Sequence, residues 1–122
     1  MTPQFRVARI YGYQPQPDET AIFLDRLYPR GVHKELMAQV VWLKDLTPSA
    51  ELRRWYHADP ENRYAEFSER YRQELQDAQH QAALQELWRL AAERAHTVLL
   101  TAVKTPERSH IAVLLDFLRE NG

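Results

Sequence analysis

The spacing of apolar residues changes near residue 49, and this change divides the predicted elements into two groups. In the first half, residues 5–11 alternate loosely and suit a strand, while residues 20–24 (TAIFL) form a short apolar run without alternation. Such a run is typical of a strand buried on both faces. Residues 33–38 fit a short helix. Residues 39–46 are ambiguous between strand and helix, but the cluster VVW at 40–42 favours a strand.

Helical spacing begins after Pro48. Ser49 is a typical N-cap residue, so a helix is predicted over residues 50–57. Asp59 followed by Pro60 repeats the signal, with a capping carboxylate and a proline at the first helical position. The next helix presents one apolar face, made of Tyr64, Phe67, Tyr71 and Leu75. A further helix over residues 79–94 is marked by Ala82, Leu84, Leu87, Trp88, Ala91 and Ala95.

The last part of the chain returns to a strand and then a helix. Residues 97–102 (TVLLTA) predict a second buried strand. Thr105 and Pro106 then start a final helix. The residues of this helix that are expected to face inward are Ile111, Leu114, Leu115 and Leu118.

This order of elements predicts a single α/β domain over residues 1–122, without repeats or linkers. We expect a small, mainly parallel sheet of about four strands flanked by helices, with a helix-rich second half. Ligands of such sheets sit beyond the carboxyl ends of the strands. Three polar segments should therefore meet there: residues 25–31, 44–49 and 101–110.

Composition limits the classes of function. With 16 Lys and Arg against 17 Asp and Glu, the formal charge is −1, which argues against extended nucleic-acid contact. The absence of cysteine excludes disulfides, thiolate metal sites and a cysteine nucleophile. The first residues lack the apolar run of a signal peptide, and no stretch reaches the ~18 apolar residues that span a bilayer. We expect a soluble, cytoplasmic protein; the oligomeric state stays open.

Known cofactor and metal motifs are also missing from the sequence. No histidine pair has the spacing H-x-x-x-H or H-x-H of a metal site. The glycine-rich loops of P-loop and Rossmann proteins and the G-x-S-x-G elbow of hydrolases are absent as well. The sequence therefore predicts no metal and no cofactor.

The segment DRLYPRG at residues 25–31 is the most informative part of the chain. It follows the buried run 20–24, and its proline and glycine should fix a bend that aims Arg26 and Arg30 at one point. A guanidinium group matches carboxylate or phosphate, so an anion site is expected. The alternative is that either arginine pairs with Asp25 or a helix end. Asp25 could act as a base or nucleophile, but the adjacent Arg26 favours its ionised form and an orienting or ion-pairing role.

Further candidates lie in the other two segments. Ser49 and the first backbone N–H groups of its helix could hold an anion, with Lys44 and Arg53 nearby; an ordinary helix cap is the alternative. His57 and His110 are candidates for moving a proton, since histidine titrates near neutral pH. For them the alternative is a packing or capping role.

These residues resemble a known family. Residues 25–31 resemble the D-R-L-W-P-R-G hallmark of the YeaO-like proteins, a bacterial family with a domain of unknown function (number 488). The likeness continues through Trp42, through residues 47–53 (TPSAELR) and 67–75, and through the strand 97–102 and His110. It implies a compact α/β domain with no assigned activity. The family's recurring polar residues fall on Asp25, Arg26, Arg30, Lys44, Ser49, Arg53, His57 and His110.

The chain departs from the family pattern at four places that bear on chemistry. Tyr28 stands where a tryptophan is usual, Gly12 and Val40 stand where an acid is usual, and Val103 takes the place of a lysine, with Lys104 one position late. The missing acids and the displaced lysine argue against a catalytic set shared with the family.

Two functions fit these residues. In the first, Arg26, Arg30 and Arg53 bind a small phosphorylated or nucleotide-like anion, Asp25 orients it, and His57 or His110 moves a proton, as in a hydrolase or transferase. In the second, the same site serves a non-catalytic sensor or interaction module for a protein or nucleic-acid partner. Trp55 and Tyr56 are candidate exposed aromatics for a protein partner.

Overall fold

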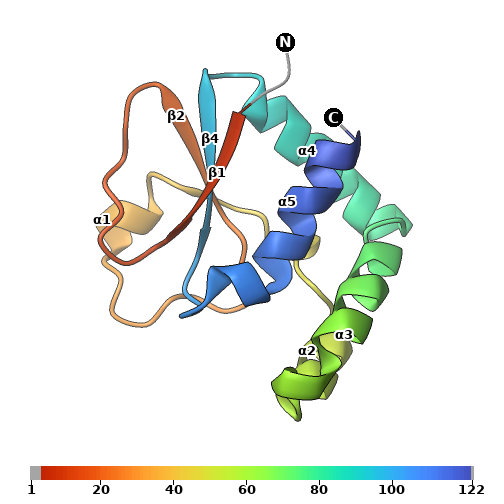
Figure 1. Ribbon diagram of the computed structural model, residues 1–122. Helices are drawn as coiled ribbons and strands as arrows, with labels where there is room; N and C mark the ends of the chain where they lie inside the picture. Colours follow the sequence, from red (N-terminus) through yellow and green to blue (C-terminus); the bar gives the residue numbers. More distant parts are fainter. Residues whose placement is uncertain (1–3, 122) are drawn as a thin grey trace.

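Four parallel strands form the centre of the computed structural model, which describes residues 4–121 (Figure 1). The strands are β1 (Gln4–Arg9), β2 (Glu19–Phe23), β3 (Val41–Trp42) and β4 (His96–Thr101), and they lie in the order β1-β4-β2-β3. All three pairings are parallel; Val98 of β4, for example, lies opposite Arg6 on one side and Ala21 on the other. The predicted α/β class is therefore confirmed, and all four carboxyl ends lie at one edge of the sheet.

Helices cover both faces of this sheet unequally. The helices are α1 (Lys34–Met37), α2 (Ala50–His57), α3 (Pro60–Glu74), α4 (Ala78–Ala91) and α5 (His110–Asn121), with 3-10 turns η1 (Lys44–Leu46) and η2 (Pro106–Arg108). Side chains of β2 alternate between two apolar clusters. Ile22 packs in the cluster formed by α2 to α5, whereas Ala21 and Phe23 pack in the cluster that includes α1. Figure 1 shows α3, α4 and α5 on one side and α1 on the other. Both faces of β2 are buried, as predicted.

The helix termini show which local sequence signals were sufficient to predict where a helix begins. Helix α2 begins and ends where the sequence predicts, and the Ser49 hydroxyl accepts a hydrogen bond from the backbone N–H of Leu52 at 3.1 Å. Asp59 precedes α3 as predicted, but its carboxylate accepts from the Asn62 side chain at 3.1 Å and makes no capping bond to the backbone. The final helix begins at His110, because η2 takes up residues 106–108.

Helix α4 differs from its prediction in extent and in the face it buries. It ends at Ala91, before the predicted end at residue 94. Ala82 and Ala95 are exposed, whereas Ala83 and Leu90 are buried. Alanine is small enough to lie on either face of a helix, so it is a weak marker of the buried side. No helix in residues 4–121 has both the length and the apolar character needed to cross a membrane.

One buried hydroxyl in β4 leads to a stability prediction. Thr97 is fully buried, and its Oγ1 has no hydrogen-bond partner among the described residues. We expect Thr97→Val to raise the free energy of unfolding by about 1 kcal/mol, because it removes an unpaired polar group and keeps the shape. Urea denaturation measures the change. Thr20→Val is the control, since the Thr20 hydroxyl donates to the Leu90 carbonyl at 3.4 Å, and no gain is expected there. A loss of stability in Thr97→Val would contradict the prediction.

Candidate functional site

A cavity of about 690 Å³ opens at the carboxyl edge of the sheet. Residues 25–30 and 102–105 form one part of its wall, and α2, the start of α3 and residues 108–110 form another. The predicted meeting of residues 25–31 with 101–110 is thus confirmed, while residues 44–49 contribute only Thr47 and Pro48. The charged and aromatic residues that line the cavity are Tyr11, Asp25, Arg26, Tyr28, Arg30, Arg53, Tyr56, His57, Phe67, Lys104, Arg108 and His110.

The DRLYPRG segment is held in a defined bend. Gly31 has a φ of +75°, the left-handed conformation that glycine adopts without a steric penalty, and Pro29 is buried. The indole N–H of Trp42 donates to the backbone carbonyl of Asp25 at 2.6 Å. The ring of Tyr28 then packs edge-to-face on Trp42, with centroids 6.1 Å apart. The segment is therefore anchored to β3 as well as to β2, which it follows.

Asp25 is committed to internal hydrogen bonds. Its Oδ1 accepts from the Thr101 hydroxyl at 2.6 Å and its Oδ2 accepts from the backbone N–H of Ala102 at 2.7 Å. The His110 Nε2 lies 3.3 Å from Oδ1. Burial alone would raise the pKa of Asp25, but the hydrogen bonds from His110 and Thr101 outweigh it and lower the pKa. The sequence predicted the lowered pKa of Asp25 but attributed it to the charge of Arg26. The structure attributes it to His110 and Thr101.

Arg26 does not pair with Asp25. Its Nη1 donates instead to the backbone carbonyl of Pro48 at 3.3 Å, which joins the DRLYPRG segment to the loop before α2. One nitrogen of a guanidinium is sufficient for this bond, so other N–H groups of Arg26 remain as donors. Arg30 is exposed and lines the same cavity. The two arginines therefore do flank one space, as the sequence predicts.

His110 has a defined tautomer in this arrangement. Its Nε2 makes a close contact with the backbone carbonyl oxygen of Leu24, in addition to its approach to Asp25. Both partners can only accept, so Nε2 carries the hydrogen. Within residues 4–121, Nδ1 makes no hydrogen bond, and it is the nitrogen left to accept a proton. His110 thus combines an anchoring role with a free basic nitrogen.

Helix α2 contributes Arg53 and His57 to the cavity wall, one turn apart. Partial burial and the positive charges of Arg53 and His110 lower the pKa of His57. The lowered pKa favours the neutral form of His57. A bound anion would offset those charges and favour its protonated form.

Ser49 and Lys44, two of the predicted ligand-binding residues, lie outside the cavity lining. The backbone N–H and the hydroxyl of Ser49 donate to the two carboxylate oxygens of Glu74, at 2.8 and 2.6 Å. Glu74 thus occupies the N-terminus of α2, where the sequence analysis placed an anion. The Lys44 ammonium lies 5.6 Å from the ring centre of Trp42 and is exposed. The structure corrects both expectations and gives Ser49 the ordinary capping role.

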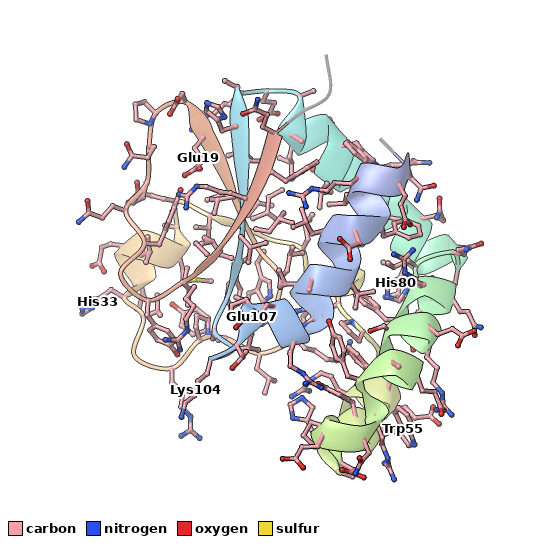
Figure 2. The ribbon with its side chains drawn as sticks, viewed as in Figure 1. Glu19, His33, Trp55, His80, Lys104 and Glu107 are labelled. Atoms are coloured by element: carbon pink, nitrogen blue, oxygen red, sulfur yellow. The ribbon has the colours of Figure 1, made fainter. Side chains whose placement is uncertain are left out.

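Two cations of the cavity wall, Arg108 and Lys104, were not among the predicted site residues. Arg108 lies in η2, and its guanidinium carbon is 5.4 Å from the ring centre of Tyr64. Lys104 follows β4, and Figure 2 shows its side chain pointing away from the body of the protein. Both belong to residues 101–110, which the sequence did place at this edge. Their positive charge within that segment was the available signal.

The two aromatics that were predicted to be exposed have other roles. Tyr56 is buried, and its hydroxyl donates to the backbone carbonyl of Arg108 at 3.2 Å. Trp55, labelled near the end of α2 in Figure 2, is contacted by two guanidinium groups, with Arg63 at 4.8 Å and Arg70 at 4.2 Å from its ring centre. Within the described part of the chain, the large aromatic side chains that are exposed are Tyr11 and Tyr28, both at the cavity.

Comparison with known proteins identifies the family. A model described as "Inactive DUF488-N3 subclade" matches residues 4–121. The chain belongs to the YeaO-like DUF488 family. An uncharacterised protein of Mycobacterium tuberculosis is 42% identical over 113 residues, which cover 93% of this chain and 92% of that protein. The uncharacterised protein YeaO of Escherichia coli is 40% identical over 111 residues, 91% of this chain and 93% of its own. No solved structure gives a significant match.

For this YeaO-like chain, the structure adds one fact on metal binding. Within the part of the chain that it describes, no three histidine, aspartate or glutamate side chains are grouped so that they could hold a metal ion. The ionisable side chains that line the cavity include four arginines, one lysine, Asp25, His57 and His110.

Proposed function

We propose that the protein binds a small anionic ligand in this cavity and does not transform it. The observation that carries the proposal is the charge of the wall. Its permanent cations are Arg26, Arg30, Arg53 and Arg108, together with Lys104, whose side chain extends away from the body of the protein. Among the residues that the structure describes, the one acid of the wall is Asp25, whose two oxygens already accept internal hydrogen bonds. The chain as a whole has a formal charge of −1, so this local excess is not a general property of its surface.

Within residues 4–121, these cations also have no carboxylate counter-ion. The ion pairs that arginines form within residues 4–121 involve Arg6, Arg70, Arg72 and Arg89, all of them away from the cavity. None of the five cavity cations lies within 4.0 Å of a carboxylate oxygen in this part of the chain. Unpaired guanidinium groups around a concave space attract an anion and match its oxygens. An anionic ligand would supply the missing charge.

Three observations favour binding over turnover. Of the three serine and threonine residues that line the cavity, Thr47, Thr105 and Ser109, two donate their hydroxyls to backbone carbonyls at 2.7 Å each, Thr47 to Lys44 and Ser109 to Pro106, and so are not paired with a general base. Asp25 is occupied as a hydrogen-bond acceptor. The matching family model is described as inactive. These points support the sensor or binding role over the hydrolase or transferase.

The Asp25–His110 pair is the observation that favours an enzyme instead. A carboxylate beside Nε2 and a free Nδ1 is an arrangement that can serve a general base. The hydrolase or transferase therefore remains the second candidate, and the test must detect turnover. A cytoplasmic location belongs to the same proposal and is checked by cell fractionation.

The proposal predicts that removal of one cavity arginine weakens anion binding. Isothermal titration with pyrophosphate as the probe should give an affinity about tenfold lower for Arg53→Ala, because a charge-assisted contact is lost. Arg30→Ala should behave alike. Arg54→Ala is the matched control, since Arg54 is the next residue on α2, is exposed and does not line the cavity. Its affinity should be unchanged.

Two results would contradict the proposal. Equal affinity of wild type, Arg53→Ala and Arg30→Ala would remove the cavity as the binding site. Conversion of pyrophosphate or of phosphate esters, followed by phosphorus NMR over many hours, would show that the protein is an enzyme. A dependence of that conversion on His110 would then identify the second candidate.

A further inference from the structure

The large hydrophobic side chains that are exposed within residues 4–121 lie at the cavity. Among residues 4–121, the large hydrophobic side chains that are exposed are Tyr11 at 41%, Leu27 at 64% and Tyr28 at 48%. All three line the cavity. Apolar surface does not contribute to the binding of an inorganic anion, because such an ion binds through charge and hydrogen bonds alone. The cavity thus offers apolar contact area beside its cations.

Tyr28 packs against a cluster of aromatic rings. Its ring packs edge-to-face on Trp42, and Trp42 packs in the same way on Phe23, with centroids 5.9 Å apart. The Trp42 indole N–H is bonded to the backbone of Asp25, so the whole stack is tied to the sheet. A fixed aromatic ring loses little conformational freedom when a ligand stacks on it. It is flanked in sequence by the cavity arginines Arg26 and Arg30.

The volume of the cavity also favours a ligand larger than an inorganic anion. A volume of about 690 Å³ lies in the range of pockets that enclose organic ligands of drug size. A phosphate or pyrophosphate ion would leave most of that space to water. A ligand that fills it must join an anionic group to a larger apolar one.

We propose that the ligand is a nucleoside phosphate, with its phosphate on the cavity arginines and its base stacked on Tyr28. The inference rests on the proposed anion-binding function and names the ligand class for the same site. Stacking of a base on an aromatic side chain tolerates any base, since every base has a flat π face. Tyr28 therefore supplies affinity for the nucleoside, while the arginines supply affinity for the phosphate.

The test compares AMP with ribose 5-phosphate, which lacks the base. Titration calorimetry on the wild-type chain should show AMP binding about tenfold more tightly, the usual effect of one stacked base. Tyr28→Ala should abolish this preference and leave ribose 5-phosphate binding unchanged. Tyr28→Phe and Tyr28→Trp should keep the preference, because they keep the ring. Thermal melting of each variant confirms that it is folded.

Each outcome separates this inference from the proposal on which it rests. Equal affinity of the wild type for AMP and ribose 5-phosphate would overturn the nucleotide inference and leave the anion site intact. The same holds if Tyr28→Ala weakens both ligands equally. Failure of AMP, ribose 5-phosphate and pyrophosphate to bind at all would overturn the anion-binding function itself. If Tyr28→Ala does not fold, equal affinities of the wild type for AMP and ribose 5-phosphate would still overturn the nucleotide inference.

Discussion

Replacing Asp25 by alanine is expected to lower the free energy of unfolding by about 3 kcal/mol, because it leaves buried donors without their acceptor. Those donors are the hydroxyl of Thr101 and the backbone N–H of Ala102, with His110 at 3.3 Å. Together they join the end of β2 to the end of β4 and the start of α5. Urea denaturation at pH 7 measures the loss. A change below about 1 kcal/mol would show that Asp25 is free for chemistry.

Asp25→Asn tests the same bonds through their pH dependence. The folded-state pKa of Asp25 lies below its ordinary value of 3.8, so its carboxylate stabilises the fold above that value. This contribution is lost as the pH falls through the folded-state pKa. Asparagine does not titrate. The stability gap between wild type and Asp25→Asn should therefore be largest near neutral pH and should narrow below pH ~4. A gap that stays constant down to pH ~2 would contradict the assignment.

Ser49→Ala is expected to destabilise the protein by about 2 kcal/mol, the second large effect. The substitution removes the cap on the Leu52 N–H and one of the two donors to Glu74. Glu74 belongs to the last turn of α3, so the cap also fixes the angle between α2 and α3. Because α2 carries Arg53 and His57, the cavity wall depends on this contact.

A matched serine in α3 provides the control for Ser49. The Ser68 hydroxyl donates to the Tyr64 carbonyl one turn earlier. Ser68→Ala should change the free energy of unfolding by less than about 0.5 kcal/mol. Equal losses for the two serines, measured by urea denaturation, would show that the Glu74 contact contributes nothing. Glu74→Gln should produce part of the Ser49→Ala loss, since it keeps one acceptor.

Asp25 was predicted as a site residue, and the structure shows that its carboxylate has a structural role. Its position at the end of a buried strand correctly placed it at the cavity. The sequence neighbour Arg26 suggested an ion pair, but the chain direction sends the Arg26 side chain towards Pro48. The real partners are 76, 77 and 85 residues away in sequence, at Thr101, Ala102 and His110. Only folding brings such distant donors together.

By itself the sequence determined several local features of this protein. The apolar run 20–24 required burial on both faces, Ser49 required a helix start, and the bend at Gly31 required a residue without a β-carbon. These choices depend on a few neighbouring residues and on backbone sterics. Because parallel strands end at one edge, they also located the site between residues 25–31 and 101–110.

The tertiary structure alone decided which of the candidate groups face the cavity and which are consumed elsewhere. It paired Ser49 with Glu74, moved Lys44 onto Trp42, and added Arg108 to the cavity wall. It also buried Tyr56 and left Tyr28 exposed beside the arginines. The reason is that a side chain's hydrogen bonds and exposure depend on what packs against it from remote segments, and sequence spacing carries no record of those partners.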